Sequence, residues 1–465
     1  MSMKSMLQHL LQDQPGHLEL RWHRRQSTVL VAQKGRVDVA RRSLSEGVGV
    51  RTLLDGSWGF AATADTGEAA IRRAIAQAQS NAGELARRRG KRRLELARAQ
   101  LAHGDSLSAG FEELQGMTLG DKLGQLVDLE RQLARASQHM HSAQASYTEY
   151  CDEKAIVSSD GACCALRAAQ AELLLWAVAQ KDGQQASAGR GAGVSTGWRS
   201  LLEHPTLVQA VDEVAALAVD LLAAPHAPAG RKRVILAPSL VGLLCHEAVG
   251  HTVEADLVQA GSVAAGKLGE MVASPLVTLA DTGGAGPAPG AAGCLPFDDE
   301  GVAASETVII REGRLQAYLH DRESAAAFGA APAGNARAWH YADPPLIRMR
   351  NTYLAPGRDS LEDMIAGVED GYLVEGAGNG QADTNGEFMF GCTHLWELKK
   401  GRKGRLLQGA SLSGLAFDVL RSIDAVSTEF RWDLGVGHCG KGQPAKVDAG
   451  GPYVRCEVNV GGRAA

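Results

Sequence analysis

The sequence lacks any uninterrupted apolar run long enough to cross a lipid bilayer, which takes about 18–20 residues. Its longest apolar stretch, VAALAVDLLAA at residues 214–224, is shorter and contains Asp220. The first residues, MSMKSMLQHLLQDQPG, include no continuous apolar segment of the kind found in secretory signals. We therefore expect no membrane association and a cytoplasmic location.

Paired cysteines and an excess of positive charge are also lacking. The eight cysteines are scattered without a C-x-x-C pair, so a disulfide framework is not expected in a chain of this size. The net charge of −5 disfavours a nucleic-acid partner, which would require a basic face. One basic run, RRRGKRR at residues 87–93, is expected to be a solvated helix end or loop.

What the sequence does contain is enough apolar material for two cores. Apolar residues make up 45% of the 465 residues, and this length is unusual for one core. We predict an α+β fold of two domains: an N-terminal domain of helices and strands over residues 1–228, and a C-terminal, mainly antiparallel β domain over residues 229–465. The stretch HAPAG at 226–230 marks the boundary, because proline and glycine are typical of linkers.

Periodicity and turn signals predict the elements of both domains. Asp55-Gly56 predicts a hairpin turn, and Asp65 with Glu68 predicts a helix-capping box. In the first domain the predicted strands are 18–22, 28–32, 48–63, 142–149, 154–159 and 164–178, and the predicted helices begin near Asp65 and span about 121–138 and 206–223. The second domain opens with a strand at 233–238 that leads directly into the helix carrying His246.

The segment LLCHEAVGHTVEAD, residues 243–256, contains the residue types of a zinc hydrolase at an unusual spacing. His246 and His251 are five residues apart, and on an ideal helix this step separates two side chains by roughly 140°. A π-type turn would bring both onto one face. Alternatively the helix could end at Gly250, which tolerates left-handed torsions, and His251 would then reach the metal from the following turn. Either arrangement leaves Glu247 beside a ligand.

The residues alone leave the remaining metal ligand open between three candidates. Cys439 lies in GVGHCGKGQP, where glycines on both sides let the loop approach an ion closely, although a lone cysteine is often just a small buried hydrophobe. Glu254, three residues after His251, would complete a His₂Glu site of the kind found in other metallohydrolases. His438, next to Cys439, is the third candidate.

With these residues in view, the sequence resembles the TldD/PmbA family, which is known as metalloproteases and as modulators of DNA gyrase. The resemblance extends in the family's order over nearly the whole chain. The matching blocks are GVGVRTLLDGSWGFAAT (47–63), SSDG (158–161), LCHEAVGHTVEAD (244–256), PFDDEG (296–301), AYLHDRESAAAFG (317–329), RMRNTYLAPG (348–357), GQADTNGEFMFG (380–391), GASLSG (409–414) and GVGHCGKGQ (435–443).

The resemblance implies a metal site and a mode of assembly. Because His246, Glu247 and His251 are present, the chain resembles the TldD-type subunit that binds zinc, and not the PmbA (TldE) type that lacks the motif. It implies Cys439 as the third ligand and places Glu254 outside the ligand set. It also implies an unstructured peptide substrate and a dimer, either with itself or with a PmbA/TldE-type subunit. The N-terminal domain would then position peptide and contribute to dimerisation.

Two imidazoles and a thiolate would leave a fourth zinc position for water, as in catalytic sites. Glu247 is then the expected general base, activating the zinc-bound water for attack on a peptide bond. No substrate-binding residue can be named. Candidates for stabilising the oxyanion are His340, Tyr341 and Arg350, for which ordinary packing is the alternative. The acids of PFDDEG (Asp298, Asp299 and Glu300) could orient a ligand histidine or bind a peptide N-terminus.

Three functions follow from this chemistry. A zinc metallopeptidase acting on extended, unstructured peptides explains all three residues of the histidine–glutamate motif. A regulatory or binding protein with a structural zinc, as the gyrase-modulator name suggests, would have no use for Glu247. A zinc hydrolase of small-molecule amides would need a narrow, closed pocket, whereas a long groove ending at the metal favours a peptide.

Overall fold

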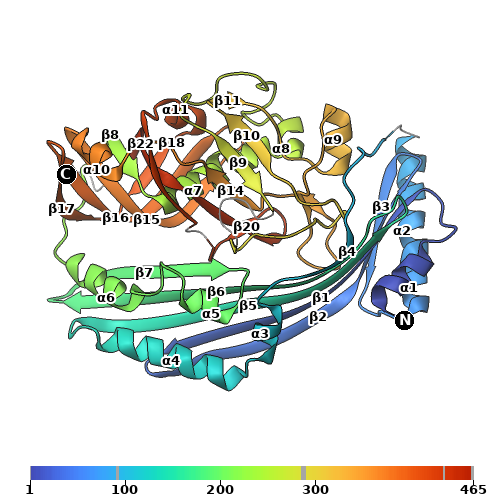
Figure 1. The fold of residues 1–465 in the computed structure, drawn as a ribbon, viewed down its shortest axis with the longest axis horizontal. Coiled ribbons are helices and arrows are strands. Elements are labelled where there is room, and N and C mark those ends of the chain that lie inside the picture. Colours follow the sequence, from blue (N-terminus) through green and yellow to red (C-terminus); the bar gives the residue numbers. More distant parts are fainter. Residues whose placement is uncertain (1, 91–93, 284–289, 433–434, 462–465) are drawn as a thin grey trace.

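The computed structural model of the protein describes residues 2–90, 94–283, 290–432 and 435–461. These residues form two large β-sheets, which pack against each other together with their helices (Figure 1). The α+β fold class predicted from the sequence is confirmed. One sheet uses strands from the first 194 residues, and the other begins at Gly230. The domain boundary at residue 228 stays a prediction. None of the helices in the described ranges combines the length and apolarity that a bilayer crossing requires.

The N-terminal sheet is built from long strands in the order β3-β2-β1-β5-β6-β4, with β7 paired to β6. Helix α4 lies along the face turned away from the second sheet, and α2 packs on β2 and β3 at one end (Figure 1). The strands are β1 His17–Gln33, β2 Arg36–Leu54, β3 Ser57–Thr63, β4 His103–Leu107, β5 Met140–Ser158, β6 Cys163–Lys181 and β7 Gln184–Val194. The helices are α1 Met3–Leu10, α2 Glu68–Arg89, α3 Phe111–Gly116, α4 Leu119–Arg135, α5 Trp198–Leu202 and α6 Ala210–Asp220.

Several predicted strands merge into longer ones because polar residues are paired across the sheet. The predicted strands 18–22 and 28–32 are parts of β1, whose intervening His23 and Arg25 hydrogen-bond to Asp152 of β5. Buried polar pairs of this kind break the apolar alternation in the sequence without breaking the strand. The runs 142–149 and 154–159 merge into β5 in the same way.

Local turn chemistry was predicted with mixed success. The Asp55-Gly56 hairpin turn is confirmed: both residues have positive φ, 49° and 73°, as a two-residue β-hairpin requires. The Asp65 capping box is wrong, because the N-cap of α2 is Gly67 and the Asp65 carboxylate accepts the Gly67 N–H instead. Arg89 ends α2, as expected for the basic run at 87–93, of which residues 91–93 lie outside the described residues.

The C-terminal sheet has eleven strands, and of its pairings only β14–β22 and β15–β8 are parallel within the described ranges, so the mainly antiparallel prediction is confirmed. Its strands are β8 Gly230–Leu236, β9 Leu279–Thr282, β10 Thr307–Arg311, β11 Arg314–Leu315, β14 Asn351–Leu354, β15 Asp370–Ala382, β16 Glu387–Lys399, β17 Arg402–Gln408, β18 Ser411–Leu415, β19 Ala425–Trp432 and β22 Asp448–Gly461. Two small hairpins pair β12 Ala336–Arg337 with β13 Leu346–Ile347, and β20 His438–Gly440 with β21 Pro444–Lys446. The helical segments are α7 Pro238–Leu243, η1 Leu244–Gly250, η2 His251–Val253, α8 Ala255–Gln259, α9 Arg322–Phe328, α10 Leu361–Ala366 and α11 Ala416–Arg421.

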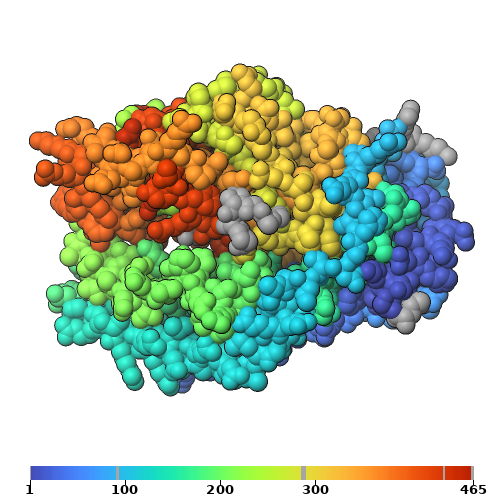
Figure 2. All heavy atoms as spheres, in the orientation of Figure 1, coloured from blue at the N-terminus to red at the C-terminus, as the bar shows by residue number. Residues whose placement is uncertain are grey.

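The two halves are joined by backbone pairing and by buried charges. Residues 97–102, light blue in Figure 2, run across the C-terminal half, where Ala97 and Ala102 donate backbone hydrogen bonds to Arg322 and Gly301. Two of the three acids of PFDDEG also serve this junction, whereas Asp298 accepts backbone N–H groups of Glu300, Val302 and Ala336 within the C-terminal half. Asp299 lies 2.8 Å from Lys154 and 3.2 Å from Arg21, and Glu300 lies 2.5 Å from Arg51. These two acids therefore neither orient a histidine ligand nor stand free for a peptide N-terminus.

Asp299 provides a test of this junction. We expect D299N to lower the free energy of unfolding at pH 7 by about 3–5 kcal/mol, because it leaves the buried Arg21 and Lys154 without their shared countercharge. Burial opposes ionisation of Asp299, but Lys154 and Arg21 outweigh it and lower its pKa below the usual range. A carboxyl with a lowered pKa stabilises the folded state above its unfolded pKa, about 3.9, and that contribution is lost as the pH falls.

The difference in unfolding free energy between wild type and D299N should therefore shrink as the pH falls below about 4, which urea titrations at several pH values would measure. Asp128 provides the control, since it is exposed and forms only a weak ion pair with Arg131, at a distance of 4.0 Å. D128N should therefore change the free energy of unfolding by less than about 0.5 kcal/mol. A deficit for D299N that stays constant down to low pH would contradict the ion-pair account.

Candidate metal centre

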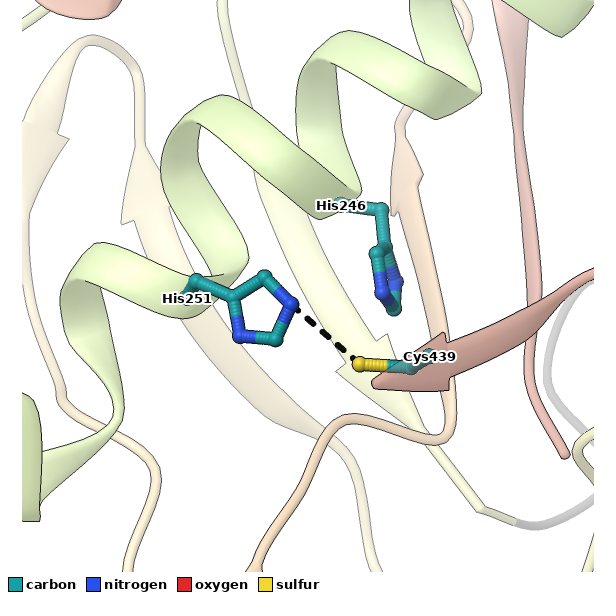
Figure 3. A group of neighbouring side chains, drawn as sticks. All are labelled: His246, His251 and Cys439. Carbon is teal, nitrogen blue, oxygen red and sulfur yellow. Dashed lines mark hydrogen bonds between the residues drawn. The ribbon is translucent and has the colours of Figure 1, made fainter. Parts of the chain in front are cut away.

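A π-type turn solves the spacing problem of the two histidines. Strand β8 leads through α7 into η1, whose backbone is π-helical from Leu244 to Gly250. The backbone N–H of His251 donates to the carbonyl of His246, a hydrogen bond that spans five residues. Because a π-turn returns to the same face after about five residues, both imidazoles point to one side of the segment (Figure 3).

Gly250 serves close packing and not an unusual torsion. Its φ of −55° and ψ of −49° are ordinary right-handed helical values, so of the two alternatives the π-type turn is present, and the left-handed torsion that Gly250 tolerates is not used. A Cβ atom added here would lie 1.9 Å from the sulfur of Met349, whose side chain is fully buried. Glycine is therefore required because Met349 packs against the π-turn.

His246, His251 and Cys439 converge on one point. One potential ligand atom from each lies within 4.8 Å of the others, although Cys439 comes from β20, 188 residues after His251 (Figure 3). The Cys439 sulfur is 3.2 Å from Nε2 of His251, and the two imidazole rings are 5.3 Å apart at 82°. Of the three candidate third ligands, the structure brings Cys439 into this group.

The donor set fits a metal ion. Both ring nitrogens of His246 are buried and have no hydrogen-bond partner among the described residues. A buried polar atom without a partner is destabilising, and an imidazole nitrogen in this state is satisfied by a metal ion. Two imidazoles and one thiolate are typical ligands of zinc in catalytic sites.

The electrostatics of the group favour a thiolate. Burial would raise the pKa of the Cys439 thiol, but the charge of His246 and the hydrogen bond with His251 outweigh it and lower the pKa to about 4. Burial likewise disfavours the charged form of His251, yet its hydrogen bonds with Cys439 and Glu254 raise its pKa well above the usual value. Without a metal, the side chains thus hold a proton on His251 opposite an anionic sulfur.

Glu254 orients His251 from outside the ligand group. Its carboxylate lies 3.0 Å from Nδ1 of His251, which leaves Nε2 facing Cys439, and it is also 3.0 Å from Nζ of Lys441. Lys441 in turn hydrogen-bonds to Asp256 and to the Ile347 carbonyl. This fully buried carboxylate therefore fixes the orientation of the ring, as residues behind metal ligands commonly do.

Other neighbours position the cysteine and were not predicted from the sequence. The buried guanidinium of Arg348 donates to the carbonyls of Cys439 and Gln443, which holds the β20–β21 hairpin beside η1. His438 is not part of the ligand group, since its ring packs against Trp339 and Tyr150. Sequence motifs could not reveal this role of Arg348, because its hydrogen-bond partners are backbone carbonyls 91 and 95 residues further along the chain.

Glu247 lies beside the ligand group and reaches the surface. Its carboxylate is 3.8 Å from Nε2 of His251, and its side chain retains 23% exposure. It lines a hollow of about 430 Å³ together with His251, His438, Lys441 and residues 380–384, which form the end of β15 and the start of the turn that follows it. A carboxylate in this position can exchange protons with a molecule bound in the hollow.

The predicted oxyanion candidates lie elsewhere and have structural partners. Arg350 is fully buried and is paired with Asp281 at 3.1 Å, with further bonds to the Ala333 and Ser305 carbonyls. The carbonyls of His340 and Tyr341 face Arg21 of β1. For these three residues the packing interpretation is therefore the one that agrees with the structure.

Known proteins are similar to this chain over nearly its whole length. Three domain models of one family match: the PmbA/TldA metallopeptidase domain 1 at residues 18–82, the central domain at 112–222, and the C-terminal domain at 229–462. A metalloprotease of Methanothermobacter thermautotrophicus is 32% identical over 97% of both chains.

Of two further similarities, one covers half of the chain and the other concerns the fold. A protein of Saccharolobus solfataricus named zinc metalloprotease TldD homolog is 35% identical over 50% of this chain and 52% of its own. The crystal structure of a Thermotoga maritima protein, described as a candidate modulator of a DNA gyrase, has the same fold, with a TM-score of 0.79. The match covers 98% of this chain and 99% of that one, at 20% sequence identity. That low identity supports a common fold only.

Gly250 allows the packing around the π-turn to be tested. We expect G250A to lower the free energy of unfolding by about 1–3 kcal/mol, because the added methyl group meets the buried Met349 side chain. Replacing Met349 by alanine in the G250A background should therefore be less destabilising than the same replacement in wild type, by at least about 1 kcal/mol.

The four proteins of this cycle would be compared by urea denaturation. Gly124 in α4 is the matched control, since a Cβ there meets nothing within 4 Å. G124A should be neutral or stabilise the protein by up to about 1 kcal/mol. Additive effects of G250A and M349A would show that the close approach of these two residues does not explain the glycine.

Proposed function

Because the chain belongs to the PmbA/TldD metallopeptidase family, we propose that it is a zinc-dependent peptidase that hydrolyses extended, unstructured peptides. The observation that carries this proposal is the convergence of His246, His251 and Cys439 beside the accessible carboxylate of Glu247. A purely structural zinc site has no use for such a carboxylate. The regulatory alternative has no comparable observation in its favour.

The three convergent residues would hold the zinc ion. The lowered pKa of Cys439 supplies a thiolate, and Glu254 orients His251 so that Nε2 faces the site. When bound, zinc acts as a Lewis acid that brings the pKa of a water molecule toward neutrality and polarises a carbonyl group. Three protein ligands would leave such an ion a coordination position for this chemistry.

Glu247 would move the protons of the reaction. As general base its carboxylate accepts a proton from the attacking water, and as general acid it returns that proton to the leaving amine nitrogen. Its partial exposure gives it access to a bound substrate, and its carboxylate lies 3.8 Å from Nε2 of His251, beside the ligand group. A positioned acid–base of this kind contributes about 10²–10⁴-fold to a rate.

The shape of the surface near Glu247 supports a peptide over a small molecule. The hollow beside Glu247 adjoins a second one of about 470 Å³, and the two share Gln381, Ala382 and Asp383. A peptide chain could occupy both, whereas a small amide would need only one closed pocket. The total volume is in the range of extended ligand sites.

A free strand edge lies along the same surface. Strand β15 pairs with β8 only from Gly371 to Val374, while its pairing with β16 continues to Ala382. Within the described residues, the remaining edge of β15 has no strand on that side. Backbone groups of a sheet edge bind an extended peptide with little dependence on its sequence.

We further propose that the working form is a dimer, formed either with a second copy or with a PmbA/TldE-type subunit. The support for this assembly is the family resemblance. Light scattering of the purified chain, alone and mixed with a PmbA-type subunit from the same source, would distinguish the two. A monomer in both samples would contradict it.

The role of Glu247 is tested by E247Q. We expect this variant to bind one zinc per chain, as wild type does, and to cleave a fluorogenic unstructured peptide with a kcat/KM lower by about 10²–10⁴-fold, because only proton transfer is removed. Metal analysis and the peptide assay would be run on the same preparations.

Glu254 is the matched control for that variant. E254Q should lower zinc affinity by about 10–100-fold, because it removes the acceptor that orients His251, and added zinc should restore its activity. Suppose instead that zinc-loaded wild type cleaves no unstructured peptide, even with a PmbA-type subunit present. The peptidase proposal would then fail, and a structural zinc in a binding protein would replace it.

Zinc binding should also release a proton. His251 has a raised pKa, so it is protonated near pH 7 in the metal-free protein, and it must lose that proton to become a ligand. We expect about one proton released per zinc at pH 7, and an apparent affinity that falls as the pH is lowered.

Titration calorimetry in buffers of different ionisation enthalpy measures this release. E254Q should release fewer protons, because it removes one of the groups that raise the pKa of His251. Binding heats that do not depend on the buffer would show that His251 is already neutral, which would contradict the assignment.

A further inference from the structure

A separate cavity, lined by apolar and charged side chains, lies between the two halves, away from the hollow that contains Glu247. It has a volume of about 60 Å³. Its walls come from β1, β5 and β6 of the N-terminal sheet, and from residues 294–299, 337–339 and 444–446 of the C-terminal half. A water molecule needs about 10–15 Å³ measured in this way, so there is room for about four to six non-hydrogen atoms. A tetrahedral oxyanion such as phosphate, with five, is of that size.

The charge of the cavity wall is positive. Arg25 is paired with Asp152, Lys154 with Asp299, and Lys446 with Glu172 of the neighbouring strand. Arg337 also lines the cavity, and no carboxylate in the described residues lies within ion-pair distance of it; its two terminal nitrogens donate to backbone carbonyls. The wall therefore contains one more cation than its ion pairs neutralise.

Two further titratable groups lie at or near this cavity. Burial and the nearby Glu300 raise the pKa of Asp298 well above the usual value, which favours its uncharged form, although this carboxyl also accepts the backbone N–H groups of Glu300, Val302 and Ala336. Burial and Lys154 lower the pKa of His23 to about 3, so His23 is neutral as well. Burial, together with the charge of Arg348, lowers the pKa of Arg337 to about 10, although Asp299 and Asp281 act in the opposite direction.

Arg25 offers an unused hydrogen-bond donor at this cavity. Its Nε and Nη2 donate to the two oxygens of Asp152 at 2.6 Å and 2.9 Å, whereas Nη1 is buried and has no partner among the described residues. The residue is only 8% exposed, and its guanidinium lies 3.7 Å from the ring centre of Trp339, which also lines the cavity. The donor is therefore held in place before any ligand binds.

We propose that this cavity binds a small inorganic oxyanion of the phosphate type, with Arg25 Nη1 and Arg337 as its main contacts. Guanidinium groups suit such a ligand because their planar donors match oxyanion geometry and their charge strengthens each hydrogen bond. The ion connects the N-terminal sheet to the β21 strand, which pairs with the strand containing Cys439. Its binding stabilises the junction of the two halves.

Inorganic phosphate is the probe, added to the zinc-loaded full chain at constant ionic strength. We expect a saturable increase in Tm, since a ligand that binds only the folded state stabilises it by mass action. Chloride at the same ionic strength should not reproduce the increase. An equal, saturable effect of chloride would identify a monatomic ion and overturn the oxyanion assignment, and the absence of any phosphate effect would mean that the cavity holds water only.

Adjacent arginines on β1 provide a matched pair of variants. R25Q removes the free donor and should weaken phosphate binding by about 10–100-fold, as expected for a charge-assisted hydrogen bond. R24Q makes the same change of net charge, but Arg24 pairs with Glu153 and does not line the cavity. R24Q should therefore bind phosphate as wild type does.

A second variant covers the case in which R25Q, with Asp152 left unpaired, does not fold. Ala168 lines the cavity from β6 and carries no charge, so A168L should fill the space and abolish the phosphate effect while keeping all the ion pairs. Phosphate binding that survives in A168L, or that is lost equally in R24Q and R25Q, would place the ion elsewhere and overturn the proposal.

Discussion

The metal group depends on one backbone hydrogen bond, from the amide of His251 to the carbonyl of His246. With ordinary helical hydrogen bonds the two imidazoles would point in directions roughly 140° apart and could not share an ion. The π-turn adds a residue and aligns them, and Gly250 lets Met349 pack against that turn without a clash. The irregular backbone is thus stabilised by packing from the sheet on which it lies.

Side chains around the metal group hold two of its three ligands. Glu254 and Lys441 hold the far nitrogen of His251, and Arg348 holds the backbone on either side of the Cys439 hairpin. The charge of the histidines favours the thiolate of Cys439, despite burial. Glu247, which also lies in the η1 turn, does not hold a ligand in this way, and its carboxylate lines the adjoining hollow.

Buried ion pairs determine how the two halves of the molecule meet. Asp299 and Glu300 from the C-terminal half pair with cations from three strands of the N-terminal sheet. Pairs of this kind add little net stability, since both charges lose their hydration, but they favour one alignment because any shift leaves a buried charge without a partner. At the same junction, Arg337 and Nη1 of Arg25 have no acidic partner among the described residues, and these two groups are the basis of the proposed anion site between the halves.

By itself, the sequence determined the α+β class, the hairpin at Asp55-Gly56 and the three residues of the histidine–glutamate motif, because these depend on local periodicity, turn torsions and residue type. It also limited the backbone conformations that let His246 and His251 share an ion to two, a π-type turn or a helix that ends at Gly250. The residues alone left the third ligand open between Cys439, Glu254 and His438, and the family resemblance implied Cys439. The tertiary structure brings Cys439 into the group. All three side chains can bind zinc, and what separates them is which one the fold places beside η1. The roles of Met349, Arg348 and the PFDDEG acids were likewise decided by partners that lie far away in the chain, and no local pattern encodes those contacts.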